Sequence, residues 1–191
     1  MTNSLPTVIQ LTTAMRGDNP DDPISTAMRA MYPCQQQRYT SLATLMDPNP
    51  GDAAARAAAA ERLAAAMAET ARCIHAIDRH ISTVPLNPAR EAQTSPYTIG
   101  EWAAARAYVA MLSHAESSTG SNYGNAARLG KLYEAYDVAR SSLLVGTARL
   151  PERASTPGTI LPDVARTSCP PIVRPAPTTN LNRSDRAWTT R

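Results

Sequence analysis

The residues of this chain best suited to metal or acid–base chemistry are its few cysteines and histidines. His75 and His80 lie five residues apart, and Cys73 comes two residues before His75. Residues on one face of a helix are three or four apart, so this spacing does not bring three ligands together. His114 has no potential partner nearby in the sequence. We therefore expect these histidines to lie on helix surfaces and predict no metal site.

Carboxylates are the second group that could act as general acids or bases. They share helix faces with basic side chains: Glu61 and Glu69 with Arg62 and Arg72, and Glu134 and Asp137 with Lys131 and Arg140. Ion pairing accounts for such an arrangement. Acid or base catalysis would also need a cleft that perturbs a pKa. We expect these carboxylates to be structural.

The glycines at 120, 124 and 130 fit neither a dinucleotide fingerprint nor a phosphate loop, and no nucleophile elbow is present. We read the segment from Gly120 to Gly124 as the turn before a helix. The sequence thus predicts no catalytic residue and no cofactor, and we expect a protein that is not an enzyme.

Tyr133 and Tyr136 beside Arg128 and Arg140 could in principle stack on nucleic acid bases and clamp their phosphates. The same spacing places both rings on the apolar stripe of a helix, and we favour that interpretation. The arginines after residue 151 are spread along the chain rather than clustered. Nucleic acid is therefore a possible partner but not the favoured one.

The composition indicates a small core. Apolar residues make up 43% of the 191 residues, but 34 of them are alanine, and the net charge is only +3. No stretch has the eighteen or more apolar residues of a membrane span, and the first ten residues do not resemble a secretory signal. Three widely spaced cysteines suit reduced thiols. We expect synthesis in a cytosol and no membrane partner.

Proline positions divide the chain into three parts. Residues 1–50 hold six prolines and residues 151–191 hold seven, whereas residues 51–150 hold three, all in one connector. We predict a helical bundle at 51–150, an N-terminal arm with one or two short helices at 1–50, and an extended C-terminal arm at 151–191. The expected fold is mainly α: a small antiparallel bundle of three principal helices with extended arms.

The first principal helix should run from the N-cap Asp52 to about residue 82. Its larger side chains recur at a 4-3-4-3-4 spacing that forms one seam: Leu63, Met67, Thr70, Ile74, Ile77 and Ile81. The alanines of residues 53–60 either face solvent or let another helix approach closely.

The second helix has the clearest start in the chain. Thr98 and Glu101 form a capping box, and Tyr97 and Trp102 occupy the positions of a hydrophobic staple. Its buried stripe should be Trp102, Ala105, Val109 and Leu112, flanked by Tyr108 and Met111. A loop at 118–121 leads to a third helix from about residue 122 to Pro151, with an apolar side made of Leu129, Leu132, Tyr133, Tyr136, Leu143 and Leu144.

The two ends are harder to interpret. We expect short helices at 25–32 and 36–46, separated by Pro33, and a β-prone segment at 7–13. The run from Cys169 to Pro177 is typical of polyproline-like chain. Such segments gain order by docking on partners.

This architecture favours a non-enzymatic structural subunit of a larger assembly, and we expect a virus or bacteriophage particle, as a capsid, cement or connector protein. The partners would be subunits of that assembly, including copies of the chain itself. Two alternatives stay open: a helical nucleoprotein that binds RNA or DNA phosphates through arginine, and an adaptor with a Pro-rich ligand tail. The candidate interface residues lie in the tail: Ile172, Val173, Arg174, Arg183, Arg186 and Trp188.

Overall fold

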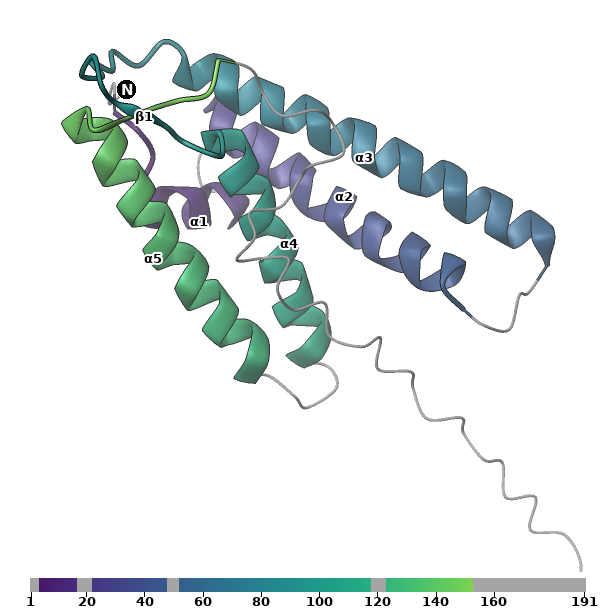
Figure 1. Ribbon diagram of the computed structural model, residues 1–191. Coiled ribbons are helices and arrows are strands. Elements are labelled where there is room, and N and C mark those ends of the chain that lie inside the picture. The colour runs from purple at the N-terminus through teal and green to yellow at the C-terminus, as the bar shows by residue number, and fades with distance from the viewer. Residues whose placement is uncertain (1–3, 17–21, 48–51, 118–122, 153–191) are drawn as a thin grey trace, which may run out of the picture.

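The computed structural model describes residues 4–16, 22–47, 52–117 and 123–152. In these ranges the chain forms five helices and two short strands (Figure 1). The elements are α1 (Val8–Arg16), α2 (Pro23–Leu45), α3 (Ala53–Ile81), β1 (Gln93–Thr94), α4 (Ile99–Ser117), α5 (Tyr123–Val145) and β2 (Ala148–Arg149). The prediction of a mainly α bundle is confirmed.

Helix α4 lies at the centre of the bundle. It packs against α2 and α3 on one side and against α5 on the other (Figure 1). Every residue from Ile99 to Val109 is buried, so the predicted stripe is buried together with the rest of this part of the helix. Its alanines leave room for helices on several sides. Helices α2 and α3 run alongside each other and extend away from the other helices at one end (Figure 1).

Helix α3 matches its prediction closely. The Asp52 carboxylate accepts a 3.0 Å hydrogen bond from the Ala54 N–H and caps the helix. The C-terminal part of the predicted seam is buried, whereas Leu63 and Met67 are half-buried. Of the alanines at 53–60, the first four are exposed, Ala58 is half-buried and Ala59 is fully buried. The start of this alanine segment therefore faces solvent, and its end lets another helix approach closely.

The capping box that starts α4 is confirmed. The Thr98 N–H donates to Glu101 Oε2 at 2.8 Å, and the Glu101 N–H donates to Thr98 Oγ1 at 3.1 Å. The Tyr97 and Trp102 rings meet edge to face with their centroids 5.5 Å apart. These contacts fix the direction in which the chain enters the helix.

A second contact ties the start of α4 to the end of α3. The Gly100 N–H donates to Asp78 Oδ1 at 2.8 Å, so a side chain of α3 caps α4. Gly100 is also where the two helices come closest, because a Cβ built at this position would lie 2.6 Å from the Ile74 carbonyl oxygen. Only a residue without a side chain fits this contact.

This junction predicts a dependence of stability on pH. Burial raises the pKa of the Asp78 carboxyl, although the Gly100 N–H acts against this shift. The folded state therefore takes up a proton at a higher pH than the unfolded state, and the free energy of unfolding gains from this group as pH falls through the folded pKa. Asp78→Asn keeps an acceptor for Gly100 but removes the charge. Urea unfolding between pH 7 and pH 4 should show this gain in the wild type and not in the variant, and parallel pH curves for the two proteins would contradict it.

The apolar side of α5 is confirmed in part. Leu132, Tyr136 and Leu143 are buried, and Leu129 and Tyr133 are half-buried. The placement of Leu144 on this side was wrong, because its side chain is 46% exposed. The helix also ends at Val145 rather than running to Pro151, since Gly146 adopts a φ of 82° that stops it.

The chain after Gly146 forms a small parallel sheet that the sequence did not predict. Gln93 pairs with Ala148, and Thr94 pairs with Arg149. The Ala89 N–H also donates to the Gly146 carbonyl at 2.8 Å. The connector between α3 and α4 is therefore fixed against the end of α5.

The segment expected to be β-prone is instead helix α1, which is a correction. Thr7 and Gln10 form a capping box of their own: the Thr7 N–H donates to Gln10 Oε1 at 2.7 Å, and the Gln10 N–H donates to Thr7 Oγ1 at 3.2 Å. Leu11 and Ala14 face the interior. Burial of this face outweighs the β propensity of the threonine-rich segment.

The two short helices expected around Pro33 are also corrected, because α2 is one continuous helix that contains this proline. Pro33 is exposed, so its missing N–H lies on the solvent side. The buried face of α2 continues past it, with Met28, Met31, Cys34 and Gln35 all inside. Packing along α3 stabilises the helix at Pro33, where one backbone hydrogen bond is missing.

The N-terminal segment differs from the extended arm that we expected. Leu5, Leu11, Met28 and Met31 belong to the same buried cluster as α3, α4 and α5. In the described part of residues 1–50, the chain is therefore part of the bundle. This segment therefore adds apolar residues to the core that we expected to form from residues 51–150 alone.

Candidate interaction surface

The side chains considered for metal binding point in different directions. Cys73 is buried, His75 is exposed and His80 is half-buried. In the residues that the structure describes, no three His, Cys, Asp or Glu side chains are placed to hold a metal ion. His114 is exposed at the end of α4. Burial raises the pKa of Cys73 to about 11 and also raises that of Cys34, so both thiols stay protonated at neutral pH.

The predicted ion pairing of the carboxylates is found for one pair. Glu69 and Arg72 form an ion pair on α3. On α5, Arg140 has a different role from the one expected, because its Nε–H donates to the Leu5 carbonyl at 3.1 Å. This bond holds the N-terminal segment against α5.

Of Tyr133 and Tyr136 on α5, only Tyr136 has a hydrogen bond to the described part of the N-terminal segment. The Tyr136 hydroxyl donates to the Pro6 carbonyl at 2.6 Å, and the residue is 3% exposed. Burial raises the pKa of Tyr136 strongly, so the hydroxyl keeps its proton. Tyr133 is half-buried and packs against Arg106, whose Cζ lies 5.5 Å from the ring centroid. Neither ring is placed to stack on bases at the surface.

Arg106 is a buried residue that the sequence analysis missed. It is 6% exposed and lies in the middle of α4. Its Nη2 donates to Thr12 Oγ1 at 2.6 Å and to the Tyr133 hydroxyl at 3.0 Å, and Nη1 contacts the Met15 sulfur. The guanidinium therefore joins α1, α4 and α5. One signal was available, because Arg106 lies four residues after Trp102 and hence on the same helix face.

The tail residues proposed as an interface lie outside the described residues. These are Ile172, Val173, Arg174, Arg183, Arg186 and Trp188, and the loop expected at 118–121 lies outside them as well. The structure describes the chain only as far as Glu152, just after β2.

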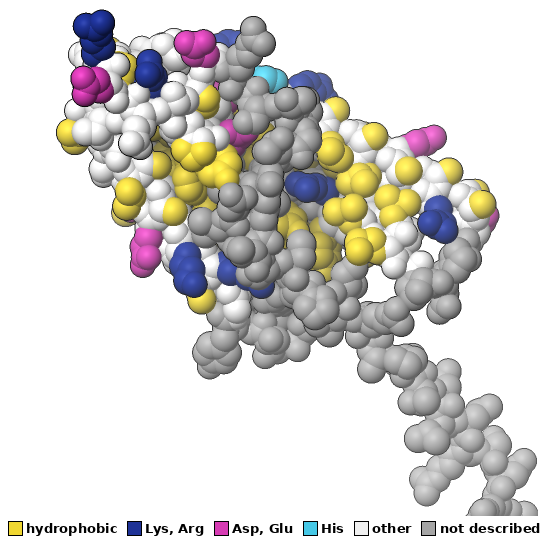
Figure 2. Space-filling model, viewed as in Figure 1, with side chains coloured by type: hydrophobic (Ala, Val, Ile, Leu, Met, Phe, Trp, Pro, Cys, Tyr) yellow, Lys and Arg dark blue, Asp and Glu magenta, His cyan; other side chains and the backbone are white. Residues whose placement is uncertain are grey.

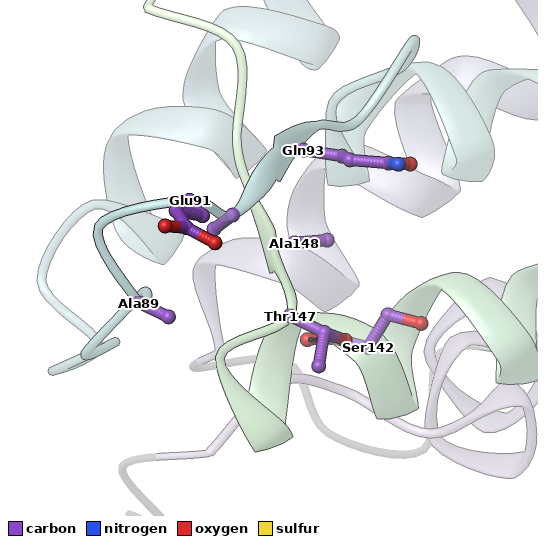
Figure 3. Close-up of a pocket in the computed structure, with 7 residues that line it drawn as sticks. Ala89, Glu91, Gln93, Ser142, Thr147 and Ala148 are labelled. Atoms are coloured by element: carbon purple, nitrogen blue, oxygen red, sulfur yellow. Dashed lines mark hydrogen bonds between the residues drawn. The ribbon is translucent and has the colours of Figure 1, made fainter.

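A pocket of about 470 Å³ lies where the connector crosses the end of α5 (Figure 3). Glu91 comes from the connector, Gln93 from β1, Ser142 from α5 and Ala148 from β2, and Thr147 directly precedes β2. The pocket is shallow and open to the surface. Its lining is mixed polar and apolar, with three alanines among the seven lining residues, and contains no histidine or cysteine.

The outward face of α5 carries a second line of evenly spaced residues. They are all exposed, recur at 4-3-4-3-4 spacing, and are called the α5 seam from here on: Ala127, Lys131, Glu134, Val138, Ser141 and Val145. Val138 is 68% exposed and Val145 is 77% exposed. Val138 and Val145 occupy equivalent positions of this seam, as apolar residues do along the seam of a helix that packs against another helix. The sequence analysis missed it because the opposite face of α5 has the larger side chains.

A second groove of about 460 Å³ lies between α2 and α3. Three of its eight lining residues are alanines, and Glu69 and Arg72, which form an ion pair, also line it. Figure 2 shows hydrophobic side chains gathered in two areas of the visible face, one over α4 and α5 and the other over α2 and α3.

Comparison with known proteins gave no match: no family model, curated protein or solved structure is similar to this chain. Among the described residues, no helix is long and apolar enough to cross a membrane.

Proposed function

We propose that the chain is a non-enzymatic structural subunit of a larger assembly, and that the α5 seam is its contact with a second copy of itself. The observation that carries this proposal is the exposure of Val138 and Val145, two turns apart on one face of a helix. Isolated exposed apolar residues need no explanation, but two valines in line on one helix face form a small apolar strip that a partner helix could cover.

The charges of the α5 seam suit a symmetric contact. Lys131 and Glu134 are exposed neighbours in the seam and carry opposite charges. When two copies of a helix pack antiparallel about a two-fold axis, each lysine can lie opposite the glutamate of the other copy. The surface is then complementary to itself. This supports a second copy of the chain as the occupant rather than an unrelated partner.

The setting we propose for this assembly is a virus or bacteriophage particle. It is supported only by the architecture: a small helical body followed by a long Pro-rich segment at 151–191. The candidate residues of that segment, Ile172, Val173 and Trp188, would contact neighbouring subunits. The segment begins beside β2, close to the C-terminal end of the α5 seam.

The α5 seam predicts the effect of removing its two valines. Replacing Val138 and Val145 together with serine should weaken self-association by about a hundredfold or more, because each buried aliphatic side chain contributes on the order of 1.5 kcal/mol, or about tenfold in the dissociation constant. Sedimentation velocity over a range of concentrations measures the change in mass.

The matched control is Met46→Ser. Met46 is the C-cap of α2 and is 66% exposed, and this end of α2 lies away from α5 in Figure 1, so the variant should associate like the wild type. A wild-type chain that stays monomeric at high concentration contradicts the proposal. So does tight binding of random RNA or DNA with a steep salt dependence, which would favour a nucleoprotein.

A further inference from the structure

The end of the α2–α3 pair that extends away from the other helices has an apolar side (Figure 1). It is formed by four half-buried side chains, called the hairpin patch from here on: Tyr39, Leu42, Leu63 and Met67. Tyr39 and Met67 still pack against the main buried cluster, whereas Leu42 and Leu63 are not among the residues that do so. The patch therefore begins at the edge of the core and continues beyond it.

The hairpin patch continues the buried faces of both helices. Gln35 is 0% exposed, and its Nε2 donates to Thr70 Oγ1 at 3.4 Å, so these two residues mark where α2 meets α3. The patch residues come four and seven residues after Gln35 on α2, and three and seven residues before Thr70 on α3. Residues at these spacings share a helix face. The pair thus has one continuous apolar side, which is buried near Gln35 and half-exposed farther out.

Two arginines lie beside the hairpin patch. Arg38 comes four residues before Leu42, and Arg56 comes seven residues before Leu63. The Arg38 Cζ lies 5.6 Å from the centroid of the Tyr108 ring, and its Nη1 has no hydrogen-bond partner among the described residues. Neither arginine forms an ion pair within the described ranges. A ligand with a carboxylate would therefore suit this side better than a basic one.

The chain itself contains a segment with this chemistry directly after its described part. Residues 154–165 have three large aliphatic side chains and a single charged one: Ile160, Leu161, Val164 and Asp163. Two prolines in this segment favour an extended backbone over a helix. The aliphatic side chains match the apolar patch, and the carboxylate matches the arginines beside it.

The segment after β2 is long enough to reach the hairpin patch. β2 pairs with β1, which ends five residues before the start of α4, and Leu150 packs against the main buried cluster. The start of α4 in turn meets α3 at Ile74. Eleven residues of helix, or about 16 Å, separate Ile74 from Leu63. Residues 153–161 span about 28 Å as polyproline-like chain, enough to run along α3 to the patch.

We propose that Ile160, Leu161 and Val164 dock on the hairpin patch of their own chain, with the Asp163 carboxylate beside Arg38. This contact is separate from the α5 seam, since the patch lies on α2 and α3. Burial of the aliphatic side chains offsets the loss of conformational entropy of the segment. The docked segment then directs the rest of the C-terminal chain from one fixed side of the bundle towards neighbouring subunits.

Hydrogen exchange of the full chain, followed by mass spectrometry, tests this docking. The amides of residues 158–166 should exchange at least about tenfold more slowly than those of an unstructured peptide of the same sequence. The protection should not change on dilution, because the contact lies within one chain. Exchange at the unstructured rate would overturn the proposal. Protection that disappears on dilution would also overturn it, since the segment would then dock on another copy.

Substitutions on each side locate the contact. Replacing Ile160 and Leu161 together with serine should remove the protection without a change in helix content, because neither residue belongs to a described helix. Leu42→Ser should remove it from the other side. Val138→Ser, on the α5 seam, is the matched control and should keep it. Protection that survives in both test variants contradicts the docking.

The same experiment separates this docking from self-association. A wild-type chain that stays monomeric but protects residues 158–166 would contradict only the contact through the α5 seam. A dimer in which these amides exchange at the unstructured rate would contradict only the docking on the hairpin patch.

Discussion

Gly100→Ala should lower the free energy of unfolding by about 3 kcal/mol. The new Cβ would lie 2.6 Å from the Ile74 carbonyl oxygen and 3.0 Å from Asp78 Oδ1. The first of these atoms belongs to the backbone of α3, so no side-chain rotation relieves the clash, and the two helices must separate. Separation also weakens the hydrogen bond from Gly100 to Asp78, which involves a charged acceptor. Equilibrium unfolding in urea measures the loss.

Gly130→Ala is the matched control. Gly130 lies inside α5, and a Cβ at this position meets no atom within 4 Å. Alanine is favoured over glycine in a helix by about 1 kcal/mol, so this variant should be more stable than the wild type. The same substitution thus has opposite signs at the two positions. If Gly100→Ala and Gly130→Ala changed the free energy of unfolding by similar amounts, α3 and α4 would not meet closely at Gly100.

Leu11→Ala should destabilise the whole bundle by about 3 kcal/mol. Leu11 is 2% exposed on α1 and belongs to the main buried cluster, and removal of a buried leucine leaves a cavity that the core fills only partly. An arm that docks only on neighbouring subunits would not show this loss in an isolated chain. The substitution therefore distinguishes a packed N-terminal segment from a free one. Thermal unfolding followed by circular dichroism measures it.

Ile9→Ala provides the comparison within the same helix. Ile9 is 76% exposed, so its truncation should change stability by no more than about 0.5 kcal/mol. An equally small effect of Leu11→Ala would contradict the packing of the N-terminal segment, whose residues Leu5, Pro6 and Thr12 contact α4 and α5.

The parts of the fold that the sequence predicted are those with strong local signals. Asp52 caps α3, and the Thr98–Glu101 box starts α4, because each signal satisfies free N–H groups within a few residues. The seam of α3 was also readable, since its isoleucines recur at a regular spacing. These features depend little on the rest of the chain.

The parts that the sequence did not predict depend on distant residues. The chain stays helical through Pro33 because α2 packs along α3, and nothing near Pro33 in the sequence records this contact. Strand β1 forms only because Gly146 turns the chain back towards Gln93. Thr7 and Gln10 have the spacing of a capping box, but the β propensity of the neighbouring residues favoured a strand in the sequence analysis.

The candidate surface was predictable only in part. Tyr133 and Tyr136 were placed correctly on the apolar side of α5, but the opposite line of Val138 and Val145 emerges only when exposure is known. Arg106 was hidden for a related reason. A lone arginine in an alanine-rich helix suggests a solvent-facing side chain, and only the packing of α1 and α5 around α4 buries it.

Crosslinking between copies tests the self-association of the chain most directly. In a Cys169→Ser background, Cys34 and Cys73 are buried and react slowly, so a cysteine introduced at Val138 is the main reactive thiol. A short bismaleimide should convert the Val138→Cys chain to a covalent dimer, whereas Ala57→Cys, at an exposed position on α3, should stay monomeric. Two results would contradict a contact through the α5 seam: both variants stay monomeric, or both form the covalent dimer to the same extent.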